Sequence, residues 1–531
     1  MKTLQAEKKS VSRKLGATSL VITLLILVQK VIGLLRESLL ANFYGTSEVM
    51  DAFLMSESVS IIVMGLIFHF SSPFTPVYAE IIERENRALA KRYQDAIFSF
   101  ILLSGLLIGV LADLFAEPLL HLIAPGYTGE VFGRTLDYFR WSVWSRVFFA
   151  LGSLLVAYLH YHGYFLITRV CYLLISITEI ITILASLSVG SIFLRYTLTL
   201  GNGVFFLCLL IACRKRGYTP RMNLQYTPHV RKTFFMVLPG LLSLALSYIN
   251  TIIDKNFASS LPTGTVSAFS YANVIYESIY LLISTATTTI ATPRISKYVA
   301  RNDQEALCGE VKNALLNTLT FMIPVVLGSV VLRREIVSLL YERGVFDAAA
   351  TAKTSIIFAI YSFLCCSRII NVILSHVVYS HGRAAVLTLV GMLSVAVNIA
   401  LNILLMPVLA HVGLAIATVV SSWAIVPMYI LLNKKYLKGF PVREMLQNCL
   451  KCLVSALAMA VAVWGVKQVI AVSANAGTME KGAKMLVYLG LGVGVYGCGV
   501  CLLKVEGASR YVHAIKGKLG ALLGKNEGGR Q

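Results

Sequence analysis

The sequence predicts an all-α protein that crosses a membrane many times. Hydrophobic residues make up 57% of the chain and charged residues only 14%, against roughly 25% charged in soluble proteins. About fourteen apolar segments each approach the roughly 20 residues that a helix needs to cross a bilayer. Charged or Gly/Pro-containing loops separate these segments. The fold class is therefore a polytopic helical membrane protein.

We expect spans near residues 15–35, 52–72, 95–115, 138–160, 166–188, 195–213, 233–253, 269–291, 312–332, 354–378, 384–406, 412–432, 449–471 and 484–503. The first segment follows a basic start, but it has no evident cleavage site and is too long for a signal peptide. It is therefore expected to remain as the first span. An even number of spans puts both termini on one side.

The distribution of lysine and arginine predicts which side that is. Cytoplasmic loops of membrane proteins retain an excess of these residues. They gather here in the N-terminal segment 1–14, in the linker 214–232 and in the loop 434–443, whereas the loops near 190 and 410 have almost none. Both termini are thus predicted to be cytoplasmic. The net charge of +21 reflects topology and attraction to anionic lipid rather than binding of nucleic acid.

A weak internal repeat predicts two lobes. The segment "ANFYGTSEVMDAF" at 41–53 resembles "KNFASSLPTGTVSAF" at 255–269, and Pro76 and Gly126 match Pro293 and Gly344. Six spans in each copy make the copies parallel repeats about an axis along the membrane normal. Such paired lobes are typical of alternating-access transporters.

These observations predict six regions. They are a basic cytoplasmic tail (1–14), an N-lobe (15–213), a basic cytoplasmic linker (214–232), a C-lobe (233–432), two further spans (433–505) and a basic C-terminal tail (506–531). In the last region Val512, Ile515, Leu519 and Leu522 recur at helical spacing. That spacing favours a helix on the inner membrane surface, and a solvated tail is the alternative.

The sequence favours a transporter over an enzyme. It contains no GxxxxGK[ST] phosphate loop, which excludes nucleotide hydrolysis by that machinery. No nucleophile stands in a recognisable triad or elbow. The driving force is therefore expected from an ion gradient, the membrane potential or the gradient of the substrate itself.

Ionisable residues inside the predicted spans are the candidate functional residues, because such groups are costly in hydrocarbon and normally face a cavity or a partner. They are Lys30, Arg36, Glu37, Asp51, Glu57, Arg146, Glu179, Asp254, Glu277, Arg368 and His376. Cations concentrated in one lobe suggest an anionic substrate, since arginine grips phosphate oxygens bidentately. The alternative is that Arg36 with Glu37, or Lys30 with Asp51, form structural ion pairs.

Small residues at regular spacing are expected to pack helices together. Two CxxC pairs, Cys449/Cys452 and Cys498/Cys501, are compatible with zinc, but packing of one helix on another is the preferred interpretation. The pairs Gly105/Gly109 and Gly490/Gly494 have the GxxxG spacing of helix contacts. No resident metal or cofactor is expected.

Four segments carry a family resemblance: "KVIGLLRESLLANFYGTSEVMDAFLMSESV", "PFTPVYAE", "LLYERGVFDAAAT" and "AVNIALNILLMPVLAHVGLAIATVVSSW". In order and spacing they resemble the MurJ (MviN) family of lipid II flippases, within the multidrug/oligosaccharidyl-lipid/polysaccharide exporter superfamily. The resemblance implies fourteen helices, two six-helix lobes, a basic central cavity and a lipid-tail groove formed by the last two spans. The implied cargo is undecaprenyl-pyrophosphate-linked peptidoglycan precursor (lipid II), moved from the inner to the outer leaflet of the bacterial cytoplasmic membrane by a monomer.

The resemblance also implies the substrate-binding residues. The family's two arginines in the first span fall on Lys30 and Arg36, the acid that follows falls on Glu37, and the aspartate of the "DAF" motif is Asp51. Two arginines usual in the family are missing, one within "SVSIIVMGLIF" and one at Val274. The Glu-Gly pair usual late in the second span is also absent. These departures leave the cargo open.

A sodium ion is the coupling ion that the resemblance suggests. Asp254, Asn398, Asn402 and Thr418 fall where some family members hold sodium. Oxygen ligands suit a hard cation, and the i, i+4 spacing puts both asparagines on one helix face. Asn402 stands where an acid is usual. Hydrogen bonding between helices is the alternative role of the asparagines.

Three functions follow as hypotheses. The first is a lipid II flippase that works by alternating access. The second is an exporter of another lipid-linked saccharide, or a drug/cation antiporter. The third is a scaffold that organises envelope synthesis without transport.

Overall fold

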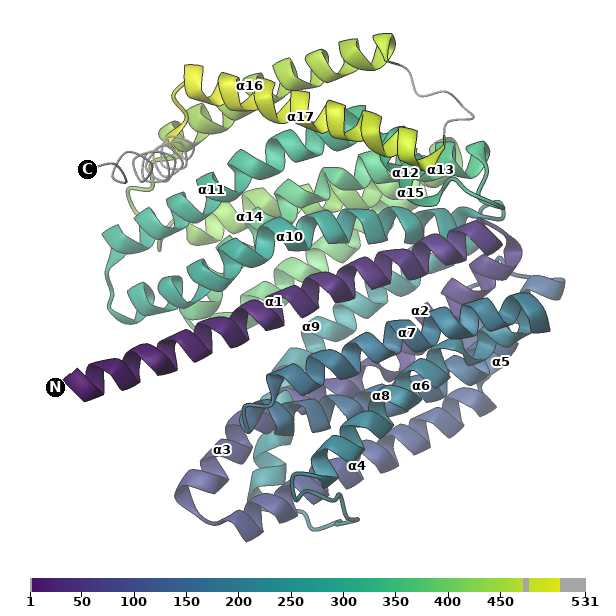
Figure 1. Cartoon of the computed structure of the whole chain (residues 1–531), viewed down its shortest axis with the longest axis vertical. Coiled ribbons are helices and arrows are strands. Elements are labelled where there is room, and N and C mark those ends of the chain that lie inside the picture. Colours follow the sequence, from purple (N-terminus) through teal and green to yellow (C-terminus); the bar gives the residue numbers. More distant parts are fainter. Residues whose placement is uncertain (1, 471–476, 507–531) are drawn as a thin grey trace, which may run out of the picture. The chain divides into compact units, whose positions relative to one another are not determined.

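A computed structural model describes residues 2–470 and 477–506, with backbone alone for 2–20, 66, 239–240, 242–244 and 246–247 (Figure 1). Every regular element in these ranges is a helix. The chain forms two compact units, which are described separately. Unit 1 comprises Met1–Ser267 and Arg343–Asp347, and unit 2 comprises Ala268–Glu342 and Ala348–Gln531. The all-α prediction is confirmed.

Unit 1 contains the helices α1 (Lys2–Tyr44), α2 (Glu48–Phe68), η1 (His69–Ser71), α3 (Phe74–Arg84), α4 (Arg87–Leu114), α5 (Ala116–Ile123), α6 (Gly129–Tyr161), α7 (Phe165–Val189), η2 (Ser191–Tyr196), α8 (Thr197–Arg214) and α9 (Pro228–Ser259). Capping residues set several helix starts. The side chain of Asn86 accepts a hydrogen bond from Leu89 N at 2.8 Å before α4, and Thr227 caps α9 ahead of Pro228.

Helix α6 lies at the centre of unit 1, because it packs against α2, α4 and α8, while α7 packs against α1 and α8. Glycines allow the approach of α4 to α6. A Cβ at Gly105 would lie 3.2 Å from Val147, and one at Gly109 would lie 2.9 Å from Trp144. Both glycines therefore pack α4 on α6, as their GxxxG spacing predicts.

Helix α9 packs with unit 1, against α2, α3, α4 and α5. The Tyr93 hydroxyl of α4 and the Thr233 hydroxyl of α9 are 2.7 Å apart, and the linker before α9 also lies along α4, where Asn223 N donates to the Ser99 hydroxyl at 2.8 Å. The sequence analysis assigned the corresponding span, 233–253, to the C-lobe. The lobe boundaries of the sequence analysis stay a prediction.

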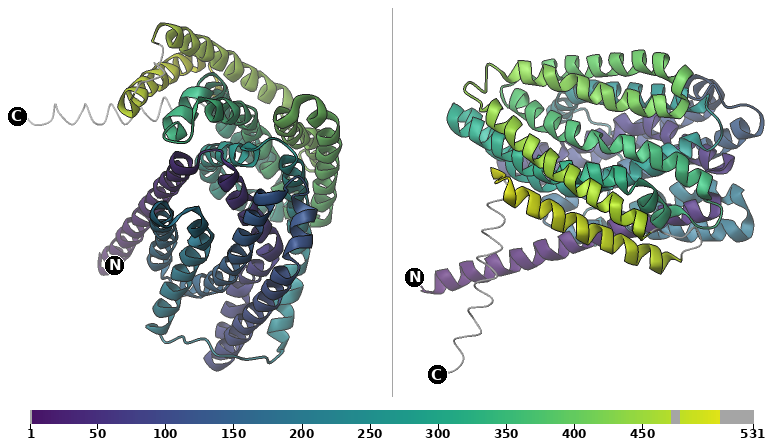
Figure 2. Two further views of the ribbon diagram at one scale, coloured as in Figure 1. Left: turned by 90° about the vertical axis from the view of Figure 1, so that its right-hand side faces the viewer. Right: turned by 90° about the horizontal axis from the view of Figure 1, so that it is seen from above.

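Unit 2 contains α10 (Thr265–Ala300, which starts within unit 1), α11 (Gln304–Val331), α12 (Arg333–Tyr341), α13 (Ala348–Ser362), α14 (Leu364–Ser380), α15 (Ala384–Asn433), α16 (Val442–Val469) and α17 (Thr478–Leu502). Helices α16 and α17 lie side by side (Figure 2), and α16 packs on α11. Gly492 contacts Met459, and a Cβ at Gly499 would lie 2.9 Å from Ser455.

The prediction that Gly490 and Gly494 pack α17 on a neighbouring helix is wrong. Among the described residues, and apart from the nearby backbone of α17 itself, no atom lies within 4 Å of a Cβ built at Gly490 or Gly494, whereas Gly492 and Gly499 face α16. Helix α17 is rich in glycine on several faces. A glycine spacing alone therefore could not identify the face that meets a neighbour.

Helix α15 is two helical segments joined at a break. Ala410 has φ 48° and ψ −126°, a conformation that L-residues rarely adopt. At Gly413 a Cβ would lie 2.5 Å from Leu405 O, so the chain packs closely around the break. The break falls between the predicted spans 384–406 and 412–432.

Among the residues searched, ten helices are long and apolar enough to span a membrane, or eleven if the bent pair Glu48–Gly65 and His69–Arg84 counts as one span. This supports a polytopic membrane protein. The predicted count of fourteen is not confirmed. The differences fall at α1 and α9, whose side chains are partly undescribed, and at α15, which covers two predicted spans. The predicted C-terminal surface helix lies outside the described residues.

Candidate functional site

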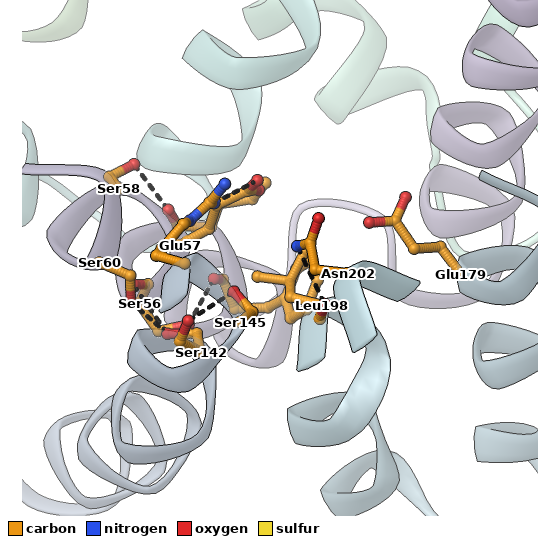
Figure 3. A network of polar contacts seen from close by, with 12 residues as sticks. Ser56, Glu57, Ser58, Ser60, Ser142, Ser145, Glu179, Leu198 and Asn202 are labelled. Atoms are coloured by element: carbon orange, nitrogen blue, oxygen red, sulfur yellow. Dashed lines mark hydrogen bonds and ion pairs between the residues drawn. The ribbon is translucent and has the colours of Figure 1, made fainter. Parts of the chain in front are cut away.

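Polar side chains gather inside unit 1 on α2, α6, α7 and α8 (Figure 3). The Ser142 hydroxyl donates to Ser56 O at 3.2 Å, the Ser145 hydroxyl donates to Ser142 O at 2.6 Å, and Ser60 contacts Ser142. All four serines are buried. They join α2 to α6, and sequence reasoning missed them because serines are common within apolar helices and carry no charge.

Arg36 on α1 is held by two carboxylates. Its Nη1 donates to Glu179 Oε2 of α7 at 2.7 Å, and its Nη2 donates to Glu37 Oε1. The Arg36 side chain is 22% exposed, while Glu37 and Glu179 are buried. The ion pair expected between Arg36 and Glu37 is present. Glu179 was a candidate from its position in a span, and the structure makes it the second partner of Arg36.

Glycine on α8 makes room for Glu179. A Cβ at Gly201 would lie 3.0 Å from Glu179 Cγ and 3.5 Å from its Oε1. The next residue, Asn202, donates to Leu198 O at 3.1 Å and is also buried. Glu179 and Asn202 are seen together in Figure 3. The carboxylate is thus fixed from α7 and α8 in the position that meets Arg36.

A second ion pair between an arginine and a glutamate joins α2 to α6. Arg146 Nη2 donates to Glu57 Oε1 at 3.1 Å, and Glu57 also interacts electrostatically with Arg36. Both arginines keep a buried Nε that has no hydrogen-bond partner within the described part of the chain. Unit 1 therefore holds two guanidinium groups that are neutralised by carboxylates, yet each retains an unused donor.

Asp51 at the start of α2 is engaged by backbone. Its two oxygens accept hydrogen bonds from Gly264 N at 2.6 Å and Ser267 N at 2.8 Å. Gly264 has φ +83°, and a Cβ there would lie 2.6 Å from Thr46 O. The observed role of Asp51 is to cap the first turn of α10. A substrate contact of Asp51 stays a prediction.

Lys30 is not brought to Arg36. It lies exposed on α1, and six residues turn a helix by about 600°, so the two side chains point about 120° apart. A cation that the sequence analysis did not select, Lys255 on α9, interacts electrostatically with Asp51, Glu57 and Asp254. The repeat motif contained Lys255, but the predicted span ended before it.

Comparisons with known proteins identify the family. The family model described as "Lipid II flippase MurJ" matches residues 40–479. The chain belongs to the lipid II flippase MurJ family. Asp51 lies within the matched range, whereas Lys30, Arg36 and Glu37 precede it, and the substrate-binding roles of all four residues stay a prediction.

Relatives in the MurJ family are distant in sequence but cover most of the chain. The "Probable lipid II flippase MurJ" of Rickettsia prowazekii is 24% identical over 414 residues, or 76% of this chain and 81% of that protein. The "Lipid II flippase MurJ" of Burkholderia cenocepacia is 23% identical over 410 residues, or 75% and 79%. The chain thus spans most of the length of these relatives.

Solved structures of the superfamily share the fold. The structure "Lipid II flippase MurJ, inward closed conformation" superposes with a TM-score of 0.77 at 21% identity, covering 91% of this chain and 98% of that one. An inward-facing multidrug resistance MATE family transporter of the MOP superfamily gives a TM-score of 0.61 at 13% identity, covering 78% and 95%. The fold is therefore shared beyond the MurJ family.

The predicted sodium residues divide between the two units. In unit 1, Asn250 Nδ2 donates to Asp254 Oδ2 at 3.3 Å on α9. In unit 2, Asn402 Nδ2 donates to Asn398 Oδ1 at 3.0 Å, both buried, and the Thr418 hydroxyl donates to Leu414 O at 3.1 Å. The two asparagines share one face of α15, as predicted. A sodium site formed by all four residues stays a prediction.

Unit 2 has an arginine of its own beside α10. Arg368 on α14 donates to the Tyr276 hydroxyl at 2.7 Å and pairs with Glu277, and its guanidinium lies 4.7 Å from the ring centroid of Tyr280. Val274, where the MurJ family usually has arginine, is within one turn of Tyr276 and Glu277 on α10. Arg368 therefore supplies α10 with a cation from a neighbouring helix.

Proposed function

We propose that this chain moves lipid II, the undecaprenyl-pyrophosphate-linked peptidoglycan precursor, from the inner to the outer leaflet by alternating access. The proposal rests on membership of the MurJ family and on one observation, the arginine Arg36 held by Glu37 and Glu179 inside an apolar unit. An ionised side chain at such a place is costly and is normally functional.

The carboxylates give Arg36 a mechanism of exchange. In the empty protein Glu37 and Glu179 neutralise the guanidinium and fix its direction. Pyrophosphate oxygens then replace a carboxylate as the partner of Arg36, and the released carboxylate takes up a proton, so neither side is left as a buried, uncompensated charge, which would cost about 3–5 kcal/mol. The Nε of Arg36, which has no hydrogen-bond partner among the described residues, offers the phosphate a further donor. Binding and release of one anion can thereby alter the contacts between α1 and α7.

The rest of the cargo needs less from the protein. A polyprenyl chain is compatible with hydrocarbon and can remain in the lipid, whereas the sugar and pyrophosphate need a polar path. The serines of α2 and α6 and the Glu57–Arg146 pair supply neutral and charged partners along such a path. Lys30 is proposed to attract the pyrophosphate from the α1 surface rather than to clamp it beside Arg36.

We further propose the setting of this activity. The chain acts as a monomeric transporter rather than an enzyme, in the bacterial cytoplasmic membrane, with both termini in the cytoplasm. It serves peptidoglycan synthesis and cell shape. Sodium is the proposed coupling ion.

A second candidate function is export of a cationic compound. It is favoured by the carboxylates of Glu37, Glu57 and Glu179, which surround the arginines of unit 1. An acidic lining attracts cations. The structural likeness to a MATE family transporter shows the fold alone.

Reconstituted vesicles test the two functions. Purified full-length chain is placed in vesicles with labelled lipid II or with a lipophilic cation, and the arrival of each at the opposite leaflet or lumen is followed. Lipid II movement that is lost in Arg36→Lys supports the proposal, because lysine keeps the positive charge but lacks the paired guanidinium donors that bind phosphate bidentately. Movement of the cation alone would contradict it and support the second function.

A further inference from the structure

An apolar crevice lies on unit 1 where α4, the linker and α9 meet. It has a volume of about 460 Å³ and is lined by Ala96, Phe100, Leu103 and Leu107 of α4, by linker residues 223–226, and by Val230 and Phe234 of α9. We call it the α4–α9 crevice. Its floor is aromatic, since the Phe100 and Phe234 rings are 4.6 Å apart at their centroids in an edge-to-face contact.

The crevice is open to the surroundings of the protein. Leu107 is 62% exposed, Leu224 72% and Tyr226 69%. Its α4 residues recur at positions i, i+4, i+7 and i+11, which places them along one helix face. From Ala96 to Leu107 this stripe is about 16 Å long at 1.5 Å per residue. That is about half of a hydrocarbon core of roughly 30 Å, the depth of one leaflet.

Cations stand at the end of the crevice that the linker forms. Arg92 is one turn before Ala96 on the same face of α4, Arg221 is two residues before the lining segment, and Arg231 follows Val230. All three are exposed, and none forms an ion pair with a described residue, although Arg221 interacts electrostatically with Asp95 and the Arg231 guanidinium lies 5.5 Å from the Phe235 ring centroid. The linker is predicted to be cytoplasmic, where the membrane surface carries anionic lipid.

Hydrogen bonds from the linker backbone and from the Tyr218 hydroxyl hold the linker on α4. Arg221 N donates to Asp95 Oδ1 at 3.1 Å, and the Tyr218 hydroxyl donates to the same oxygen at 3.1 Å. Asn223 N donates to the Ser99 hydroxyl at 2.8 Å. Burial raises the pKa of the Tyr218 hydroxyl, which therefore stays a donor. The guanidinium of Arg221 interacts electrostatically with Asp95, but it is exposed and forms no ion pair with a described residue, so it can also meet a second anion.

We propose that the α4–α9 crevice binds an anionic phospholipid of the inner leaflet. One acyl chain lies along the α4 stripe, and the headgroup phosphate meets Arg221 and Arg231, with Arg92 beside them. The positive N-terminus of α9 adds to the attraction. This site is separate from the cargo residues Arg36 and Glu179, so it does not depend on the proposed function. It would fix the linker and α9 to the membrane while the cargo is moved.

Native mass spectrometry of the full-length chain in detergent tests the proposal, with phosphatidylglycerol and phosphatidylcholine of identical acyl chains as probes. The double variant Arg221→Ala with Arg231→Ala removes the headgroup contacts but keeps the backbone hydrogen bonds. Ser104→Phe, on α4 within the crevice, fills the chain site. Lys435→Ala is the matched control, because Lys435 is an exposed cation 4.5 Å from the Tyr436 ring centroid in unit 2.

The parent is expected to bind phosphatidylglycerol more tightly than phosphatidylcholine. The double arginine variant should lose on the order of tenfold in phosphatidylglycerol affinity, Ser104→Phe should weaken both lipids, and Lys435→Ala should change neither. Equal affinities of the parent for the two lipids would overturn the proposal. An unchanged affinity in Ser104→Phe would do the same. Displacement of phosphatidylglycerol by lipid II through the same residues would identify the cargo tail as the occupant instead.

Discussion

At the scale of residues, the two carboxylates around Arg36 suggest a test that distinguishes a structural role of this arginine from a role in substrate binding. Removing Arg36 alone leaves Glu37 and Glu179 without their cation, so a loss of activity would be mixed with a loss of stability. The pair Arg36 and Glu179 is joined at 2.7 Å. Changing both to neutral amides keeps hydrogen bonds from residue 36 to residues 37 and 179 possible, and Glu37 then carries the net charge of −1 that the three residues have in the parent.

We therefore expect Arg36→Gln with Glu179→Gln to fold and accumulate like the parent but to lose at least about a hundredfold in flipping, since two charge-assisted contacts of about 1.5–3 kcal/mol each are lost. Abundance in the membrane and outer-leaflet lipid II are the measurements. Arg134→Gln with Glu130→Gln removes an ion pair of α6 whose acid is exposed and should change neither. Normal flipping by the Arg36 pair variant would refute the role of Arg36 in binding.

Gly201 tests the positioning of Glu179. In Gly201→Ala the new Cβ would lie 3.0 Å from Glu179 Cγ and displace the carboxylate from Arg36. A shift of this kind is expected to reduce flipping on the order of tenfold with little change in thermal stability. Gly203→Ala is the control on the same helix, because its Cβ would reach only Phe148, at 4.0 Å. Equal activities of the two variants would show that the position of Glu179 does not matter.

At the scale of elements, the break in α15 stores backbone strain. Ala410 at φ 48° costs of order 1–3 kcal/mol as a non-glycine residue. Ala410→Gly should therefore raise the free energy of unfolding of the purified protein by about 1 kcal/mol, once the entropic penalty of glycine is subtracted. Thermal unfolding measures this change. Ala417→Gly, a buried position in the helical part of α15, should lower it. A destabilised Ala410→Gly would mean that the break is not strained.

The elements also show what the sequence could and could not predict. The apolar segments predicted the helices well, because a helix satisfies its backbone hydrogen bonds within a single apolar segment. Gly105 and Gly109 marked a real helix contact, whereas Gly490 and Gly494 did not, since spacing does not reveal which face meets a neighbour. Arg36 and Glu179 were predicted as candidates because they are charged residues within apolar segments. It could not show that Asp51 caps α10 or that Lys30 points away from Arg36.

At the scale of the whole molecule, orientation remains the prediction that is simplest to check. The excess of lysine and arginine in 1–14, 214–232 and 434–443 predicts cytoplasmic termini. Fluorescent protein fused after Gln531 should fluoresce, because it folds in the cytoplasm, and alkaline phosphatase fused there should be inactive. The reverse pair of results would invert the topology and place the α4–α9 crevice in the outer leaflet.

Membership of the MurJ family describes the chain as a whole, but two arginines usual in that family are absent from it. Arg368 of α14 donates to α10 near Val274, and Arg146 of α6 pairs with Glu57 of α2. In each unit, an arginine from a neighbouring helix therefore supplies a cation to a helix that lacks the arginine usual in the family. We therefore propose that the arginines present are sufficient to bind the lipid II cargo of the MurJ family.

Complementation tests that claim most directly. The chain is expressed in a bacterium depleted of its own lipid II flippase, and outer-leaflet lipid II is measured together with growth, with the Arg36→Gln and Glu179→Gln double variant in parallel. The account predicts that the parent restores both and that the variant restores neither. A parent that is abundant in the membrane and leaves outer-leaflet lipid II at the depleted level would contradict it.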